Sequence, residues 1–361
     1  MNILHLVWGS AEAYGGVEHH VRNLCRFMSE RGHPSWVAAL PALSEAGLTG
    51  WWADSALPLL NLREALIDLI DRRRVDLVMT HNLHLKMAAG VASAVVELLA
   101  DRGLPHVASV EDVFEQEAAA ARTLFGRAAA VITISAPNAE LMRRHLQIDP
   151  QAVIWPMVDV ASFDPHAEPA PRTIAYPARL TRPKGARGAV RLIGYLAREL
   201  GPLTLLLSDD RPQAVGVDRA LVEDLLQDAA AFPGLTLAFN RADGVVGMLR
   251  TAEVVMATPN SREGFGMVPA ESLASGRPVV ALPTGGMAWV REAPGVLVPR
   301  SDAIAMAAAV ARILANREEW RARALEGRAW VERRFDPDLI CGRYVEVCAA
   351  ALASAQPALV R

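Results

Sequence analysis

Short apolar runs alternate with longer amphipathic stretches along the first part of the chain. The apolar runs have the length of buried β-strands and fall at Ile3–Val7, Trp36–Leu40, Leu77–Thr80, His106–Val110 and Ala130–Ile134. Stretches with helical periodicity separate them, at Val17–Arg31, Leu62–Arg73, Lys86–Arg102 and Pro137–Leu146. This β-α-β rhythm predicts a parallel, doubly wound sheet.

The rhythm pauses at Asp164–Arg172, where three prolines in nine residues predict a linker. It then resumes with apolar runs at Thr173–Tyr176, Leu203–Leu207, Leu235–Phe239, Val254–Ala257, Val279–Leu282 and Gly295–Val298. The sequence therefore predicts two α/β domains in series, residues 1–165 and 172–335. Because ligands of such sheets bind beyond the carboxyl ends of the strands, the loops that follow strands are the expected places for chemistry.

Composition and charge narrow the class of protein. Apolar residues make up 52% of the 361 residues, enough for two cores, and the net charge of -3 provides no basic field for a nucleic acid. The three cysteines, Cys25, Cys341 and Cys348, have no zinc-like spacing and are typical of a reducing compartment. With no apolar run of about 18 residues, the sequence predicts a cytoplasmic protein without a membrane span and leaves peripheral contact with a membrane open.

The most informative loop follows the run Val254–Ala257. Glu263 and Glu271 lie eight residues apart in it, around Gly264 and Gly266, just where a helix is expected to begin. Glycines allow a ligand to approach the backbone, the first N–H groups of a helix bind phosphate, and a carboxylate accepts paired hydrogen bonds from hydroxyl groups. A glycine turn with solvated glutamates is the alternative.

Three further loops carry candidate residues. Arg179 and Lys184 lie five apart after Thr173–Tyr176 and can clamp a diphosphate, although an ordinary basic loop has the same composition. Gly15 and Gly16 precede the first helix, where a tight turn is the alternative. His81, Asn82 and His84 follow Leu77–Thr80; without a Cys or a cluster of carboxylates nearby, buried histidines are favoured over a metal site.

These motifs together resemble the retaining GT-B glycosyltransferases of family 4. Glu263–Glu271 is similar to the family's E-x7-E signature, Ala274–Val280 to its A-x-G-x-P-V-V segment, Pro177–Gly185 to G-R-L-x-x-x-K-G and Gly15–Glu18 to G-G-x-E. The helix after Phe335, about residues 339–354, resembles the element that crosses back to the first domain. The resemblance is strong from Pro177 to Gly286 and thinner in the first domain.

The resemblance implies a GT-B fold, two Rossmann-like domains facing a cleft, with the acceptor bound by the first domain and a nucleotide sugar by the second. It implies that Glu263 lies beside the transferred sugar, that Glu271 holds the ribose, and that Arg179 and Lys184 bind the diphosphate. The implied donor-binding set is Gly16, Gly264, Phe265, Gly266, Met267, Val268 and Glu271, and the acceptor-side set is Gly15, His81 and Asn82.

The match also has gaps. Where the family commonly has a histidine after the fifth strand, this chain has Glu111 followed by Asp112, which either stabilise a forming positive charge, bind a basic group of the acceptor, or cap a helix. Ala178 replaces the glycine before Arg179, and Ser208–Arg211 replaces a glycine-rich turn. These departures predict unusual specificity for the donor or the acceptor.

We therefore expect an enzyme of the hexosyltransferase type. It moves a sugar from a UDP- or GDP-linked donor to a small-molecule or glycan acceptor. Protein cations replace a metal in this prediction, so no cofactor is required, and the protein is a monomer or a homodimer. A non-catalytic nucleotide-sugar-binding protein and a GT-B epimerase are the alternatives. An NAD-dependent oxidoreductase is disfavoured because no G-x-G-x-x-G follows the first strand.

Overall fold

A computed structural model describes residues 1–8, 16–40, 55–56, 61–83, 89–113, 118–209, 217–240 and 244–355. The chain forms two compact units: unit 1 comprises Met1–Met157 and Pro337–Arg361, and unit 2 comprises Val158–Asp336. The Pro-rich segment Asp164–Arg172 thus belongs to unit 2, because Arg277 and Arg321 of that unit donate hydrogen bonds to the carbonyls of Ala167 and His166.

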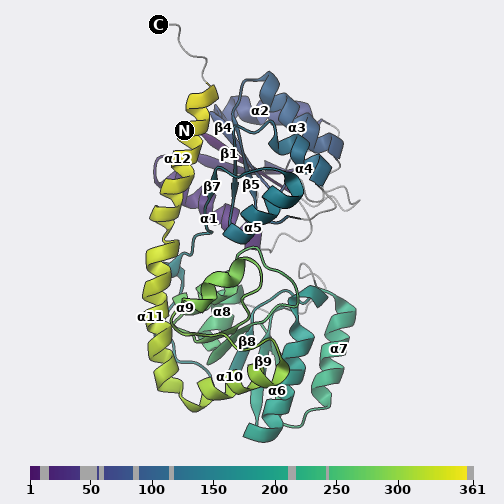
Figure 1. Ribbon diagram of the computed structural model, residues 1–361, viewed down its shortest axis with the longest axis vertical. Coiled ribbons are helices and arrows are strands. Elements are labelled where there is room, and N and C mark those ends of the chain that lie inside the picture. Colours follow the sequence, from purple (N-terminus) through teal and green to yellow (C-terminus); the bar gives the residue numbers. More distant parts are fainter. Residues whose placement is uncertain are drawn as a thin grey trace. The chain divides into compact units, whose positions relative to one another are not determined.

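Unit 1 is built on a seven-stranded sheet in the order β3-β2-β1-β4-β5-β6-β7, and every recorded strand pair in it is parallel (Figure 1). Its strands are β1 Ile3–Trp8, β2 Ser35–Leu40, β3 Ser55–Ala56, β4 Leu77–His81, β5 His106–Val110, β6 Ala130–Thr133 and β7 Ala152–Val153. Its helices are α1 Gly16–Glu30, α2 Leu62–Arg73, α3 Ala89–Asp101, α4 Ala118–Phe125, α5 Ala136–Leu141 with a π-helical turn Met142–Leu146, and α12 Pro337–Ala355.

The central strands of unit 1 are buried along their whole length, as parallel sheets covered on both faces require. The C-terminal helix α12 covers one of these faces. Its residues Ile340, Tyr344 and Cys348 follow helical spacing and join the core cluster that contains Ile3 and Leu77. The end of the chain therefore completes the core of the unit in which the chain begins.

Unit 2 is built on a six-stranded sheet in the order β10-β9-β8-β11-β12-β13, again with parallel pairs. Its strands are β8 Thr173–Tyr176, β9 Leu203–Leu207, β10 Leu235–Phe239, β11 Val254–Ala257, β12 Val279–Ala281 and β13 Val296–Leu297. Its helices are α6 Ala186–Leu200, α7 Arg219–Ala230, α8 Gly244–Thr251, α9 Met267–Ala274, α10 Ala303–Ala315 and α11 Arg317–Phe335, with 3-10 turns Val160–Ser162, Arg182–Lys184 and Gly286–Arg291.

Helix α6 of unit 2 follows from an amphipathic pattern in the sequence. In α6 the residues Ala186, Ala189, Val190, Ile193 and Leu196 recur at three- and four-residue spacing and are buried against the sheet. The helix α10 begins at a clear N-cap, since the Asp302 carboxylate accepts a hydrogen bond of 2.8 Å from the N–H of Ala305. Local pattern and local capping thus agree with the observed elements.

The expected elements are largely confirmed. Each predicted strand ends within one residue of an observed one, whereas the two-residue strands β3 and β7 were not predicted. The stretch expected as one helix over Pro137–Leu146 changes from α5 to a π-helical turn at Met142. None of the helices within the described ranges combines the length and apolarity that a membrane-spanning segment needs.

Candidate functional site

The sheet of unit 2 reverses its strand order between β8 and β11, which lie side by side. From β8 the chain builds outward to β10 and then returns to β11 on the other side. The loops after two such strands diverge, and this is where open α/β sheets bind their ligands. The loop after β8 carries Arg179 and Lys184, and the loop after β11 carries Glu263, so the two predicted donor motifs meet at the switch point of the sheet.

An ion pair joins these two loops. The Lys184 Nζ atom lies 2.7 Å from Glu263 Oε1, and the two side chains are 26% and 19% exposed. This geometry is a charge-assisted hydrogen bond in a partly desolvated setting, where it is stronger than at a free surface. An ammonium group has three donors, so Lys184 can hold Glu263 and still donate to an anion.

Hydrogen bonds to the Pro183 carbonyl also join the two loops. The Asn260 N–H donates to the Pro183 carbonyl at 3.0 Å, and the Ser261 hydroxyl donates to the same carbonyl at 3.4 Å. On its other side, the Glu263 carbonyl accepts from the Gly286 N–H at 2.8 Å. The sequence motifs did not single out Asn260, whose role depends on a neighbour 77 positions earlier in the chain.

Helix α9 begins directly behind Glu263. Its N-cap is Gly266, which has φ +82° and no side chain to occupy the first N–H groups of the helix. A Cβ atom at Gly266 would lie 2.3 Å from Cγ of Met287, so only glycine fits here. The half-buried residues Gly264, Met267 and Val268 surround this helix end, where unpaired N–H groups and the helix dipole favour an anion.

Glu271 lies one turn into α9 and is 6% exposed. Burial raises the pKa of its carboxyl group to about 7. Its carboxyl oxygens make no hydrogen bond or ion pair within the part of the chain that the structure describes, which leaves them as acceptors for a hydroxyl-bearing ligand.

Phe265 occupies a different place from its neighbours in the motif. Its ring stacks on Trp289 with centroids 5.5 Å apart and meets Phe335 edge to face at 5.1 Å. Its carbonyl accepts a hydrogen bond of 3.0 Å from the indole N–H of Trp289. The side chain of Phe265 therefore anchors the loop in the core of unit 2, and only its backbone is available at the site.

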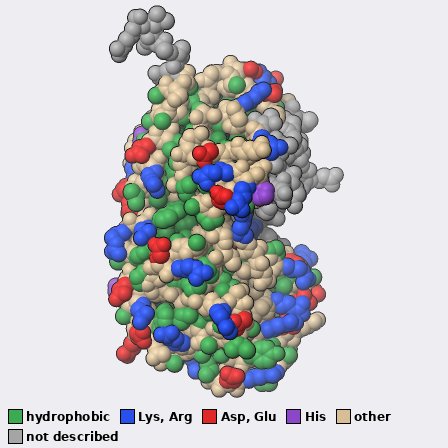
Figure 2. Space-filling model, viewed as in Figure 1, with side chains coloured by type: hydrophobic (Ala, Val, Ile, Leu, Met, Phe, Trp, Pro, Cys, Tyr) green, Lys and Arg blue, Asp and Glu red, His purple; other side chains and the backbone are tan. Residues whose placement is uncertain are grey.

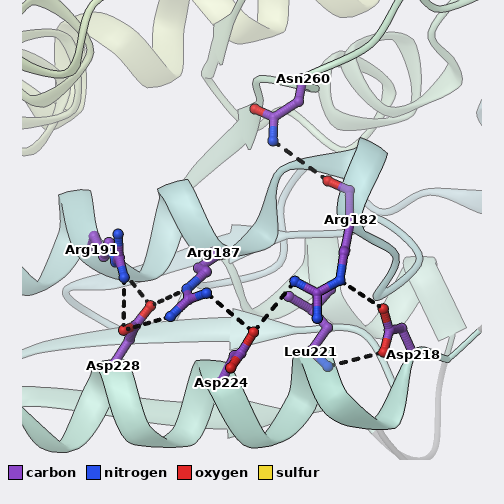
Figure 3. Close-up of polar contacts among 8 residues, drawn as sticks. All are labelled: Arg182, Arg187, Arg191, Asp218, Leu221, Asp224, Asp228 and Asn260. Atoms are coloured by element: carbon purple, nitrogen blue, oxygen red, sulfur yellow. Dashed lines mark hydrogen bonds and ion pairs between the residues drawn. The ribbon is translucent and has the colours of Figure 1, made fainter.

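Arg179 is half-buried in the loop after β8. Arg182, in the 3-10 turn before α6, belongs to a ladder of ion pairs with residues of α6, of α7 and of the α7 N-cap (Figure 3). Arg182 lies 3.3 Å from Asp218 and 3.4 Å from Asp224; Asp224 also contacts Arg187 at 3.1 Å. Further along, Asp228 contacts Arg187 at 2.7 Å and Arg191 at 2.9 Å, and these two guanidinium groups lower its pKa to about 2. Arg182 therefore has carboxylate partners of its own.

This ladder is part of a wider mixture of charges on unit 2. On the face drawn in Figure 2, Lys and Arg side chains of this unit lie among Asp and Glu side chains rather than in one continuous field. Among the described residues, no group of three or more His, Cys, Asp or Glu side chains is arranged to hold a metal ion.

In unit 1, the strand order reverses between β1 and β4. Gly16 is the first residue of α1, and His81 ends β4. Asn82 follows with φ +50°, and its side-chain oxygen accepts from the N–H groups of Glu111 at 2.7 Å and Asp112 at 3.3 Å. Asn82 thus connects the loops after β4 and β5 and brings the predicted residues His81 and Glu111 together.

Buried ionisable side chains surround this point. His81 Nδ1 lies 3.6 Å from Glu111 Oε1, and His81 Nε2 lies 3.1 Å from Nδ1 of His5. Behind them, His20 Nε2 lies 2.9 Å from the Tyr344 hydroxyl of α12. His5 and His20 were not predicted, because a lone histidine in a strand or on a helix has no recognisable motif.

The electrostatics of this group are set by burial. Burial lowers the pKa of His81 to about 3 and that of His20 to about 4, so both are neutral near pH 7. Burial also raises the pKa of Glu111 to about 7; His20 opposes this shift and Asp112 adds to it. Glu111 Oε1 and His81 Nδ1 have no hydrogen-bond partner within the described residues, although they face each other.

Several predicted residues cannot be placed. Gly15, expected on the acceptor side, and His84 lie outside the described residues. The same holds for Asp210 and Arg211 in the segment that replaces the family's glycine-rich turn.

Family models match both halves of the chain. The model described as Glycosyltransferase Family 4 matches residues 14–162, and the model described as Glycosyl transferases group 1 matches residues 171–316. Together they cover most of the chain and include every site residue that the sequence motifs predicted.

The curated proteins that are similar to this chain are named as glycosyltransferases. A 2-deoxystreptamine glucosyltransferase of Streptomyces kanamyceticus is 27% identical over 242 residues, which are 64% of this chain and 60% of that protein. A D-inositol 3-phosphate glycosyltransferase of Xylanimonas cellulosilytica is 32% identical over 181 residues, 49% of this chain and 42% of that protein. The chain thus spans less than two thirds of the length of these relatives.

Solved structures share the whole fold at low identity. HepE of Anabaena in complex with UDP and glucose has a TM-score of 0.75 at 15% identity, covering 97% of this chain and 100% of that one. The sucrose-phosphate synthase of Thermosynechococcus elongatus has a TM-score of 0.77 at 20% identity, with 98% and 100% coverage. The chain therefore has the GT-B fold and belongs to the group 1 glycosyltransferases of family 4.

Proposed function

We propose that this protein is a retaining glycosyltransferase that moves a sugar from a nucleotide-diphosphate sugar to a hydroxyl-bearing acceptor. The observation that carries the proposal is the Lys184–Glu263 pair of 2.7 Å at the switch point of unit 2. It combines a cation for a leaving diphosphate with a carboxylate for sugar hydroxyls, next to the open N-terminus of α9.

The donor is assigned to the loops of unit 2. Arg179 and Lys184 bind the diphosphate, the N–H groups at the start of α9 add partial positive charge, and the Glu271 carboxyl group accepts from the ribose. Structures of HepE hold UDP and UDP-glucose, which supports a UDP-linked sugar as the first donor to examine.

The chemistry follows from where charge develops. The bond between the sugar C1 and the diphosphate oxygen breaks, and the acceptor oxygen bonds to C1 on the same face. The proton of the acceptor hydroxyl passes to the departing phosphate oxygen. Negative charge grows on the diphosphate, and the cations of Arg179 and Lys184 stabilise it without a reorganisation of solvent. We propose that these cations make a divalent metal unnecessary.

The acceptor is assigned to unit 1, near His81, Asn82 and Glu111. The relatives described above are named for 2-deoxystreptamine, an amine-bearing cyclitol, and D-inositol 3-phosphate, a phosphate-bearing one. The buried carboxyl group of Glu111 and its neutral histidine neighbours supply no cation for a phosphate. These surroundings favour an uncharged or amine-bearing small molecule.

The test is a screen of the purified protein with UDP- and GDP-linked hexoses, in the presence of a metal chelator, with and without 2-deoxystreptamine and D-inositol 3-phosphate. We expect nucleotide release that depends on the acceptor, and a product with the anomeric configuration of the donor by NMR. An inverted product would refute retention. Conversion of the donor sugar without an acceptor would identify an epimerase, and binding without release a non-catalytic receptor.

A further inference from the structure

The Tyr176 hydroxyl lies between the two loops of the proposed donor site. Tyr176 is the last residue of β8 and is 1% exposed. Its hydroxyl oxygen lies 2.5 Å from the carbonyl of Lys184 and 3.0 Å from the carbonyl of Thr258. One carbonyl belongs to the loop that carries Lys184 and the other to the loop that carries Glu263, so a single O–H group is shared between them.

A glycine makes room for this contact. Gly185 follows Lys184 with φ +87°, and a Cβ atom there would lie 2.9 Å from the Thr258 carbonyl and 3.0 Å from the Tyr176 hydroxyl. A side chain at this position would push the two loops apart where the hydroxyl joins them. Tyr176, Lys184 and Thr258 therefore approach one another closely because residue 185 has no side chain.

The core does not need the hydroxyl. The Tyr176 ring packs in the main apolar cluster of unit 2 with Ile174, Leu180 and Val254, where a phenylalanine ring would fill the same volume. A hydroxyl group in such a setting costs free energy unless it is hydrogen-bonded. Burial also raises the pKa of Tyr176, so the group stays a donor near neutral pH.

The location of the Lys184 ammonium depends on this contact. Its flexible side chain starts from the backbone that the Tyr176 hydroxyl holds, and it ends 2.7 Å from Glu263. A shift of the Lys184 carbonyl changes where the ammonium group sits relative to a diphosphate, and misplacement by about 1 Å is costly to catalysis.

We propose that Tyr176 is a positioning residue: its hydroxyl holds the carbonyls of Lys184 and Thr258 together and thereby sets the Lys184 ammonium at Glu263. This inference rests on the proposed function, since it assigns the ammonium a part in glycosyl transfer.

The test compares Tyr176→Phe with Tyr344→Phe. Tyr344 is equally buried, in unit 1, and its hydroxyl also has a polar partner, His20 Nε2 at 2.9 Å. We expect Tyr176→Phe to lower kcat by about tenfold with a donor KM within about twofold of the wild type. Hydrogen exchange should rise in residues 179–185 and 258–263. Tyr344→Phe should leave UDP affinity and the exchange of these loops unchanged.

A double-mutant cycle with Lys184→Ala separates positioning from general destabilisation. If Tyr176 acts through Lys184, adding Tyr176→Phe to Lys184→Ala lowers kcat no further. Equal losses in both backgrounds, or an unchanged kcat in Tyr176→Phe, would overturn the proposal. A wild-type protein without turnover on nucleotide sugars would instead refute the proposed function, and unchanged loop exchange in Tyr176→Phe would still refute the positioning contact.

Discussion

The pair Lys184–Glu263 in unit 2 and the pair His81–Glu111 in unit 1 place ionisable side chains in opposite surroundings. In unit 2, Lys184 and Glu263 form a partly exposed pair at 2.7 Å, with both partners retaining solvent contact. In unit 1, His81 and Glu111 are buried, 3.6 Å apart, and each has an atom without a hydrogen-bond partner in the described residues. The first pair is accessible to a charged ligand, whereas burial pushes the groups of the second pair toward neutrality.

Three glutamates show that the surroundings of a side chain, and not its residue type, decide whether it pairs with a cation or is buried without one. Glu263 has Lys184 as its counter-ion, whereas no cation contacts Glu111 or Glu271 in the described structure, and burial raises the pKa of each to about 7. A carboxyl group with this pKa changes its proton occupancy in the physiological range. The same side chain thus pairs with a cation in one loop and is a buried titrating group in two other places.

The largest effect is expected from removing the cation of the Lys184–Glu263 pair in unit 2. Lys184→Ala should lower kcat for glycosyl transfer by about 100-fold or more, because the departing diphosphate loses its point charge. Steady-state kinetics checks this. Arg300→Ala removes an 86% exposed cation from the same unit and should leave kcat unchanged. Retention of half the wild-type rate by folded Lys184→Ala would exclude Lys184 from the mechanism.

The second largest effect concerns Glu271. If its carboxylate accepts from the ribose, UDP should bind more tightly at pH 8 than at pH 6, because the ionised form predominates above the pKa of about 7. Glu271→Gln should weaken binding about 50-fold at pH 8 and reduce the pH dependence to that of the UDP phosphate, whose own pKa is about 6. Calorimetric titration at both pH values measures this. Glu111→Gln should keep the wild-type dependence, and a pH-independent wild type would count against the ribose contact.

A smaller effect is expected on the stability of unit 1. The pKa of Glu111 is raised on folding, so the folded state keeps a proton that the unfolded state has lost, and stability falls as pH rises from about 4.5 to about 7. Glu111→Gln should raise the thermal midpoint at pH 8 by a few degrees, which corresponds to a gain in the free energy of unfolding on the order of 2 kcal/mol. At pH 4 it should leave the midpoint unchanged.

The control for that experiment is Glu346→Gln, which alters an exposed glutamate on α12 of the same unit. It should not change the midpoint at either pH. A lower midpoint for Glu111→Gln at pH 8 would mean that the ionised carboxylate stabilises unit 1, contrary to the effect of burial described above.

The smallest effect belongs to the ion-pair ladder around Asp228 in unit 2. The pKa of Asp228 is lowered to about 2, so its contribution to stability is present above about pH 4 and is lost as pH falls through 2. Asp228→Asn should cost about 1 kcal/mol at neutral pH and low salt, and less in 0.5 M salt because these ion pairs are screened. Thermal melts at two salt concentrations check this; a cost that grows with salt would contradict it.

The sequence predicted the elements well because their signals are local. Short apolar runs predict the buried strands β4, β5 and β8. Apolar residues at three- and four-residue spacing predict the buried face of α6. The two-residue strands β3 and β7 were not predicted from such a pattern, although β13, which is equally short, was. The motifs likewise placed Lys184 and Glu263 in loops after strands, where the structure has them.

The chain by itself therefore determined the alternation of strands and helices, the doubly wound class and the positions of the loops that carry the candidate motifs. Only the tertiary structure decided which side chains meet: Lys184 with Glu263 across 79 positions, and His20 with Tyr344 across 324. It also decided the protonation of Glu111 and Glu271, because desolvation and counter-ions come from segments distant in sequence. Periodicity is a property of neighbours along the chain, whereas charge state is a property of neighbours in space.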